Sequence, residues 1–217
     1  MRLFLIWLFI FMSHLVTANE YDADNGEEIN EICAGCHGEF GQGSDDSEYP
    51  RLAGLPAAFI AEQLHLFRDR KRPNMAMIEY IDERQMPDAD ILDVSTYLSA
   101  IKLATKLPPA NPQDPDFDAY ARLLASKKLM QIPRYAGDVV AGKKTYNREC
   151  RSCHGKQGGG KADMPMLAGQ YTPYLKRQLK KYEQGLRQHD DDDALFFSQF
   201  TVEELDNIFA YLSIVDD

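Results

Sequence analysis

Apolar residues recur three and four positions apart in several stretches of this chain, and no stretch alternates apolar and polar residues as a strand would. This spacing puts the apolar side chains on one face of a helix, so each stretch is predicted to be an amphipathic helix. The clearest stretches hold Phe59, Ile60, Leu64 and Phe67; Ile91, Val94, Leu98 and Ile101; Tyr174, Leu175, Leu179 and Tyr182; and Leu205, Ile208, Phe209 and Leu212. The pattern predicts an all-α fold.

Capping residues indicate where helices of the second half begin. Asp138 can cap a helix that runs up to Cys150, and Thr172 followed by Pro173 is a favourable start for the next helix. Thr201 with Glu204 three residues later forms a capping-box signature at the start of the last helix.

The helical pattern occurs twice because the chain is an internal duplication. Equivalent positions are offset by 117 residues at the cysteines, 115 in the middle and 114 near the end. The repeated segments are Leu52-Ala53-Gly54 and Leu167-Ala168-Gly169, Gln63 and Gln178, Arg72 and Arg187, and Tyr97-Leu98-Ser99 and Tyr211-Leu212-Ser213. We predict two units, at residues 22–105 and 138–217, each too small to bury much core on protein atoms alone.

A proline-rich stretch separates the two units. Residues 107–115 read Leu-Pro-Pro-Ala-Asn-Pro-Gln-Asp-Pro, which favours a stiff, extended linker. A short helix is predicted after it, with Phe117, Tyr120, Leu123 and Leu124 on one face. We expect residues 106–137 to form this linker and helix, with the apolar face packed on a neighbouring unit.

The amino terminus has the features of an export signal. Arg2 precedes an apolar run at residues 3–12, and Val16-Thr17-Ala18 follows as a small-residue site. The run is short for a membrane span, so we interpret residues 1–18 as a cleavable signal peptide, with an uncleaved anchor as the alternative. We therefore expect a periplasmic protein without stable membrane insertion after cleavage.

The formal net charge of −10 bears on the choice of partners. Nucleic acid is disfavoured because its phosphates repel an acidic protein. Docking to a basic patch on a redox protein is compatible with this charge, and so is the simpler role of keeping an exported protein soluble.

Two copies of one motif carry the chemistry. Residues 33–37 read Cys-Ala-Gly-Cys-His, residues 150–154 read Cys-Arg-Ser-Cys-His, and together they hold all 4 cysteines of the chain. CxxCH is the attachment motif of c-type haem, in which the cysteines form thioethers and the histidine is placed to bind the iron. We predict two covalently bound haem c groups. The residues are Cys33, Cys36, Cys150 and Cys153 for attachment, and His37 and His154 as iron ligands.

Zinc binding and dithiol redox chemistry are the alternatives for a CxxC pair. Zinc would require both pairs to converge on one metal ion, but each pair lies in its own repeat. A thioredoxin-like motif would require a βαβ setting, which the pattern does not predict. Haem attachment is the interpretation that also fits an exported protein.

With these motifs the chain resembles the periplasmic dihaem class I cytochromes c of the cytochrome c-four type. The resemblance covers nearly the whole mature chain and rests on CxxCHG at residues 33–38 and 150–155, on Pro50-Arg51-Leu52-Ala53-Gly54, and on the middle and closing helices. It implies two tandem class I cytochrome c domains, each built of short helices around one haem. It also implies a histidine on one side of each iron and usually a methionine on the other.

The resemblance implies a distal methionine after the middle helix, in a stretch resembling Arg-x-Asn-x-x-Met. Residues 72–77 of the first unit read Arg-Pro-Asn-Met-Ala-Met, so Met77 takes the matching position. Met75 and Met86 are the alternatives, and some of these methionines can serve simply as packing.

The second unit lacks such a methionine. Its equivalent stretch reads Arg187-Gln188-His189 followed by four aspartates, and no methionine follows Met166. Of the remaining histidines, His65 belongs to the first unit, so we hypothesise that His189 is the distal ligand of the second haem. The alternative is a surface histidine, with the second iron left open. Methionine raises a haem potential relative to histidine, so His189 ligation would send electrons from the second unit to the first.

The resemblance favours a soluble electron carrier that passes single electrons between redox proteins and has no substrate chemistry of its own. An open second iron would instead suit a haem enzyme or a ligand sensor. A third interpretation makes the chain the cytochrome subunit of a dehydrogenase or oxidase complex. The sequence identifies neither electron donor nor acceptor.

Two basic clusters complete the list of candidate features. They consist of Arg68, Arg70, Lys71 and Arg72, and of Lys176, Arg177, Lys180 and Lys181. We expect solvated helix faces, with one arginine in each cluster as a candidate partner of a haem propionate.

Overall fold

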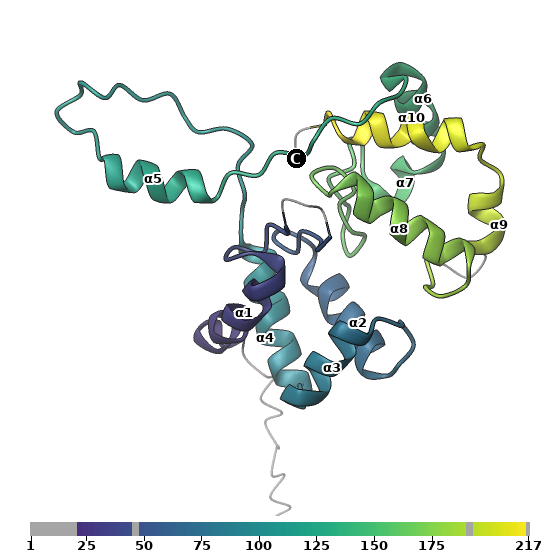
Figure 1. The fold of residues 1–217 in the computed structure, drawn as a ribbon, viewed down its shortest axis with the longest axis horizontal. Helices are drawn as coiled ribbons and strands as arrows, with labels where there is room; N and C mark the ends of the chain where they lie inside the picture. The colour runs from purple at the N-terminus through teal and green to yellow at the C-terminus, as the bar shows by residue number, and fades with distance from the viewer. Residues whose placement is uncertain (1–20, 45–47, 190–192, 216–217) are drawn as a thin grey trace, which may run out of the picture.

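The computed structural model describes residues 21–44, 48–189 and 193–215, and the fold within them is helical (Figure 1). The predicted signal peptide at residues 1–18 lies outside the described residues. The described part contains no strands and only two isolated bridges, Ala104–Leu129 and Lys161–Met164. The helices are α1 (Ala23–His37), α2 (Ala57–Arg68), α3 (Met75–Arg84), α4 (Asp88–Ala100), α5 (Ala119–Lys127), α6 (Val139–Glu149), α7 (Arg151–His154), α8 (Thr172–Glu183), α9 (Asp193–Ser198) and α10 (Val202–Leu212).

Helices α1 to α4 form the first unit around one apolar core. Helix α1 packs against α4, and α2 packs against both α3 and α4. The buried side chains are Ile29, Leu55, Ile60, Phe67, Ile78, Ile81, Met86, Ile91, Val94 and Leu98. The predicted apolar faces of the middle and closing helices therefore point inward, as expected.

Helices α6 to α10 form the second unit, in which α10 packs on α6 and α9 packs on α8. Its buried cluster is smaller and consists of Tyr146, Ile208, Tyr211 and Leu212. The hydroxyl of Tyr146 donates a hydrogen bond of 2.8 Å to the carbonyl oxygen of Gly155, which directly follows the second motif. This aromatic side chain thus joins the first helix of the unit to its attachment loop.

The two units repeat one close crossing of helices. A Cβ atom on Gly26 of α1 would lie 2.6 Å from the carbonyl oxygen of Asp93 in α4. At the equivalent crossing, a Cβ atom on Gly142 of α6 would lie 1.8 Å from the carbonyl oxygen of Asn207 in α10. Glycine is required at both positions because the partner backbone occupies the space of a side chain.

Side chains at these crossings also form hydrogen bonds to the residues that cap the crossing helices. The carboxylate of Asp93 accepts a hydrogen bond of 2.9 Å from the backbone N–H of Asp22, which caps α1. The side-chain oxygen of Asn207 accepts one of 2.7 Å from the backbone N–H of Asp138, which caps α6. The internal duplication therefore extends to the hydrogen bonds that set the helix packing.

The predicted helix starts in the second unit are confirmed. Asp138 caps α6 through two backbone N–H groups, α8 begins at Thr172, and Thr201 and Glu204 form both bonds of a capping box at α10. The pattern did not predict α3 and α9, and α9 is a short helix of 6 residues.

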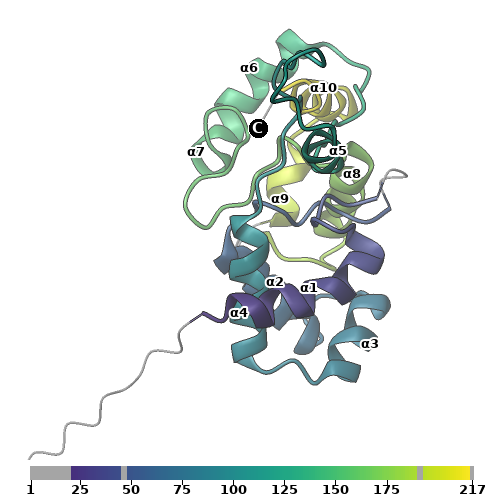
Figure 2. The same cartoon turned by 90° about the vertical axis from the view of Figure 1, so that its left-hand side faces the viewer.

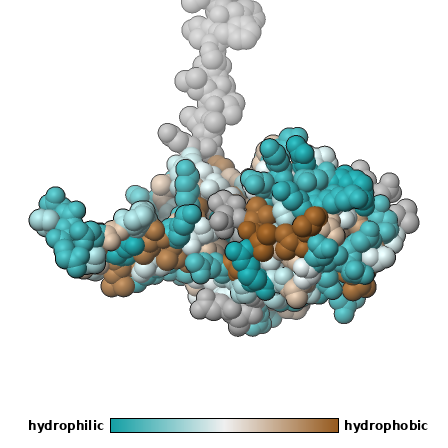
Figure 3. Space-filling view, turned by 90° about the horizontal axis from the view of Figure 1, so that it is seen from above, coloured by the Kyte–Doolittle hydropathy of each residue, from teal (hydrophilic) through white to brown (hydrophobic). Residues whose placement is uncertain are grey.

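The linker segment forms an arm that projects from the body of the molecule (Figure 1). A bridge between Ala104 and Leu129 closes its base. The predicted short helix exists as α5, but the expectation that its apolar face packs on a neighbouring unit is wrong. Tyr120 is 69% exposed and Leu123 is 57% exposed, because the closed base holds the helix away from both units. Figure 3 shows hydrophilic and apolar residues side by side on this arm, at the left.

The two units lie one above the other in both ribbon views (Figures 1 and 2). At their boundary, the backbone N–H of Arg51 donates to Oε1 of Gln170 at 3.0 Å, and Nε2 of Gln170 donates back to the carbonyl oxygen of Arg51 at 2.9 Å. These buried hydrogen bonds fix one loop of the first unit against the second.

Gly142→Ala is expected to destabilise the holoprotein by about 1–3 kcal/mol, since α6 and α10 must move apart to admit the methyl group. Gly159→Ala is the matched control, because its Cβ atom would meet nothing within 4 Å. Denaturant unfolding measures both variants. Equal stability of the two would show that the close crossing is not required.

Candidate haem sites

The same hydrogen bond holds both candidate proximal histidines. Nδ1 of His37 lies 2.9 Å from the carbonyl oxygen of Pro50, and Nδ1 of His154 lies 2.9 Å from that of Pro165. A carbonyl only accepts, so Nδ1 carries the proton and Nε2 keeps a lone pair for a metal. Burial lowers the pKa of both histidines, which favours the neutral imidazole that binds metals.

The two cysteines of each motif differ in how far they are exposed to solvent. Cys33 and Cys150 are half-buried, whereas Cys36 and Cys153 are exposed. Burial raises the pKa of Cys33 and of Cys150 to about 11. Reactive dithiol cysteines have a lowered pKa instead, so this shift argues against dithiol redox catalysis. The described residues include no cluster of three or more side chains that would bring the pairs together on a zinc ion.

His189 lies close to the proximal histidine of the second unit. The ring centres of His154 and His189 are 5.9 Å apart, and the ring planes are inclined by 41°. Imidazoles on opposite sides of one metal ion, each with a metal–nitrogen bond of about 2 Å, have ring centres roughly 6 Å apart. The spacing therefore matches that of two histidines sharing one iron.

Aromatic side chains surround the His189 ring. Tyr182 of α8 meets it edge-on at 5.1 Å, Phe197 of α9 does so at 5.2 Å, and Phe196 of α9 stacks on it at 6.1 Å. These contacts orient the imidazole although the residue as a whole is exposed. Sequence reasoning identified the histidine and missed this cluster, because the short helix that carries two of its members was not predicted.

The three candidate methionines of the first unit differ in their surroundings. Met77 in α3 is half-buried and packs against the core of the unit. Met75 is 66% exposed, whereas Met86, between α3 and α4, is 2% exposed and lies within that core. Met77 thus combines contact with the interior and a partly accessible side chain, as a ligand requires.

Two buried arginines meet at the boundary between the units. The guanidinium of Arg72 donates to Oε1 of Gln63 at 2.8 Å and to Oε1 of Gln178 at 3.2 Å. The guanidinium of Arg187 donates to Oε1 of Gln178 at 2.9 Å and to Oε1 of Gln63 at 3.1 Å. Each arginine therefore bonds a glutamine of both units, and Arg72 also donates to the hydroxyl of Tyr174 at 3.2 Å.

This arginine pair lacks a compensating acid among the described residues. Nε of Arg187 is buried without a hydrogen-bond partner, and burial lowers the pKa of Arg72. Burial raises the pKa of Tyr174, but the charges of Arg72 and Arg187 outweigh it and the net shift is downward. Burying guanidinium groups is costly, and the buried Nε of Arg187 still has a hydrogen to donate, so the site fits a group that brings carboxylates. Haem carries two propionate carboxylates, and Arg72 and Arg187 would hold them.

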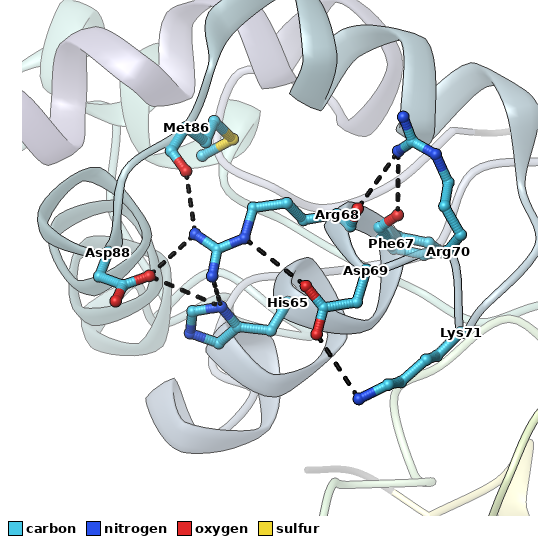
Figure 4. Close-up of polar contacts among 8 residues, drawn as sticks. All are labelled: His65, Phe67, Arg68, Asp69, Arg70, Lys71, Met86 and Asp88. Carbon is cyan, nitrogen blue, oxygen red and sulfur yellow. Dashed lines mark hydrogen bonds and ion pairs between the residues drawn. The ribbon is translucent and has the colours of Figure 1, made fainter.

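The rest of the first basic cluster is paired at the surface, as expected. Figure 4 shows Arg68 between Asp88, at 2.8 Å, and Nδ1 of His65, at 2.9 Å. Its Nη1 also donates to the carbonyl oxygen of Met86, and Lys71 pairs with Asp69 at 3.6 Å. His65 is therefore engaged in a surface network of the first unit.

Two helical units, each with a buried histidine held beside a cysteine pair, define a c-type cytochrome with two haems. A sequence model of the cytochrome c family matches residues 23–102 and 139–215. The chain belongs to the cytochrome c family. It carries two covalently bound haem c groups and serves as an electron carrier rather than as an enzyme.

Several curated relatives and solved structures are similar to the chain. A cytochrome c4 of Pseudomonas aeruginosa is 27% identical over 82% of this chain and 79% of its own. A thiosulfate dehydrogenase electron acceptor of Stutzerimonas stutzeri is 34% identical over 75% of this chain and 68% of its own. Reduced recombinant cytochrome c4 from Pseudomonas stutzeri shares the fold, with a TM-score of 0.68 at 20% identity over 91% of this chain and 100% of its own.

A further similar structure is that of a longer chain. The thiosulfate dehydrogenase TsdBA from Marichromatium purpuratum matches with a TM-score of 0.64 and 26% identity. The match covers 90% of this chain and 40% of that one. Most of this chain is therefore similar to less than half of that protein.

Arg187→Gln is expected to lower the reduction potential of the second haem by an amount on the order of tens of millivolts, because a nearby positive charge favours the reduced state. Redox titration of the holoprotein measures this shift. Arg70→Gln is the control, since Arg70 is half exposed and pairs with Asp82 at 2.5 Å. Unchanged potentials in the Arg187 variant would contradict carboxylate binding at the arginine pair.

Proposed function

We propose that this cytochrome is an exported, periplasmic carrier of single electrons with two unlike haem sites, Met77 completing the first and His189 the second. Electrons enter at the second unit and leave from the first. The predicted signal at residues 1–18 supports export. None of the described helices is long and apolar enough to cross a membrane.

The approach of His189 to His154, with ring centres 5.9 Å apart, is the observation that carries this proposal. A solvated surface histidine would not need to lie next to the proximal ring within a cluster of three aromatic side chains. The same contact argues against an open iron in the second unit, and so against an enzyme or a ligand sensor.

The two ligand sets give the direction of transfer. When bound, each haem iron exchanges one electron between its ferric and ferrous states. Met77 as a ligand raises the reduction potential of the first site, and His189 lowers that of the second. The hydrogen bonds from His37 and His154 to proline carbonyls are alike, so the proximal side adds little to this difference.

A second candidate role is that of electron acceptor for a partner dehydrogenase. It is favoured by the thiosulfate dehydrogenase electron acceptors of Stutzerimonas stutzeri and Thiomonas intermedia, which are 34% and 32% identical to this chain. The role is a special case of the carrier function in which the donor is a thiosulfate-oxidising enzyme. Co-purification from the native source with such an enzyme tests it, and reduction of the purified cytochrome by that enzyme and thiosulfate is the expected result.

His189→Ala is expected to convert the second haem from low-spin to high-spin, because one axial ligand is lost. Absorption and electron-paramagnetic-resonance spectra of the oxidised holoprotein measure the change, and His65→Ala is the control because His65 pairs with Arg68 at the surface. Unchanged low-spin signals from both haems in the His189 variant would falsify the ligand assignment.

His189→Met is expected to raise the second potential by ~0.1 V or more, within the roughly 0.8 V that axial ligands span. Redox titration resolves this shift, and the first potential stays where it was. Two potentials that do not move would leave the proposed direction of transfer without its physical basis.

Met77→Ala is expected to lower the first potential and remove the methionine signature from the absorption spectrum. Met75→Ala is the matched control, two residues away on the same helix and more exposed. If the control variant loses the signature instead, Met75 is the ligand.

A further inference from the structure

Tyr182, in the last turn of α8, contacts both a buried arginine and the proposed ligand His189. The guanidinium carbon of Arg187, a residue that is 5% exposed, lies 4.9 Å from the centre of the Tyr182 ring. The ring of His189 meets the Tyr182 ring edge-on, with the centres 5.1 Å apart and the planes inclined by 77°. The phenol ring therefore joins the exposed histidine to a side chain that is fixed at the boundary between the units.

A second aromatic ring, that of Phe197 in α9, contacts the same two side chains. The rings of Phe197 and Tyr182 stack with their centres 5.6 Å apart and their planes inclined by only 13°. Phe197 also meets His189 edge-on at 5.2 Å. Helix α9 packs on α8, and Figure 1 shows it beside the end of α8, at the right. Stacked and edge-on aromatic pairs at these separations are attractive, so rings from two helices hold the imidazole.

The first unit has the equivalent arginine and ring. The guanidinium carbon of Arg72 lies 4.5 Å from the centre of the Phe67 ring. Phe67 and Tyr182 are 115 residues apart, as are Arg72 and Arg187. Phe67 is 5% exposed and belongs to the apolar core of its unit. The contact between arginine and ring is thus common to both units, and the second unit adds the contact with His189.

His189 needs support from its neighbours because it lies beyond the end of α8, outside any helix. An exposed side chain in such a segment changes rotamer within picoseconds to nanoseconds unless packing prevents it. Groups that fix the orientation of a metal ligand without touching the metal contribute to the strength of metal binding, and their loss typically costs about 10–100-fold in metal affinity.

We propose that Tyr182 and Phe197 are positioning residues for the second haem, whose rings fix the plane of the His189 imidazole and so keep this ligand on the iron. The ring of Tyr182 carries this role rather than its hydroxyl, because the contacts with Arg187, Phe197 and His189 are contacts of the ring. The inference rests on the proposed ligation by His189 and names the residues that stabilise it.

Cyanide binding to the oxidised holoprotein tests the inference, because cyanide competes with the distal ligand for a ferric haem. Tyr182→Leu is expected to raise the apparent cyanide affinity of the second haem about tenfold or more, since a less firmly held His189 is displaced more easily. Binding at the first haem is followed separately through the methionine signature in the absorption spectrum.

Electron paramagnetic resonance gives a second measurement without an added ligand. The imidazole planes of His154 and His189 are inclined by 41°. The shape of the low-spin ferric signal depends on the relative orientation of two axial imidazole planes, so Tyr182→Leu is expected to change this signal for the second haem.

Three further variants serve as controls and as an independent test. Tyr182→Phe keeps the ring and is expected to match the wild type in cyanide affinity and in spectrum. Phe67→Leu is the matched control, because it removes the equivalent ring of the first unit and is expected to leave the second haem unchanged. Phe197→Leu removes the ring on α9 and is expected to raise the cyanide affinity of the second haem, so it tests the inference even where Tyr182→Leu fails to fold.

An unchanged cyanide affinity of the second haem in Tyr182→Leu or in Phe197→Leu would overturn the inference. A Tyr182→Phe variant that behaves like Tyr182→Leu would contradict it as well, because the hydroxyl would then hold the ligand. An equal rise in Phe67→Leu would show general loosening of the protein instead of positioning. The proposed function fails separately, through an unchanged low-spin signal in His189→Ala. If that signal is lost while both ring variants bind cyanide like the wild type, only the present inference is rejected.

Discussion

The crossed hydrogen bonds of Arg72 and Arg187 with Gln63 and Gln178 are the constraint on which the arrangement of the molecule depends. Each guanidinium is buried and bonds a glutamine of both units, so neither unit can shift without leaving a buried polar group unpaired. The same guanidinium groups bring positive charge that the carboxylates of the haem groups can offset. Packing of the two units therefore depends on these side chains, which would also hold the carboxylates of the haem groups.

Much of the fold could be predicted from local pattern. Helical periodicity and capping identified α2, α4, α8 and α10, because those helices bury one face within their own unit. The packing of α5 was mispredicted because the exposure of Tyr120 depends on a bridge between residues 104 and 129, which no local pattern encodes. The partners of Arg187 lie in the other unit, 124 residues away at Gln63. The available sequence signal was that the glutamine and the arginine each recur 115 residues later, as Gln63 and Gln178 and as Arg72 and Arg187.

Duplication has kept the attachment chemistry and changed what surrounds it. Both proximal histidines are fixed by a proline carbonyl, and both helix crossings depend on a glycine. The proposed distal ligands differ, with Met77 in one unit and His189, which lies among aromatic rings, in the other. The proposed difference in ligands would give the carrier two ends that are not interchangeable.

Redox titration of the wild-type holoprotein, followed by electron paramagnetic resonance, tests the claim of unlike haems most directly. Each potential can then be assigned to the ligand set whose signal appears or disappears with it. Two separate potentials are predicted, and the lower one belongs to the haem with the signal of two histidine ligands. A single shared potential, or a methionine signature from both haems, would contradict the account.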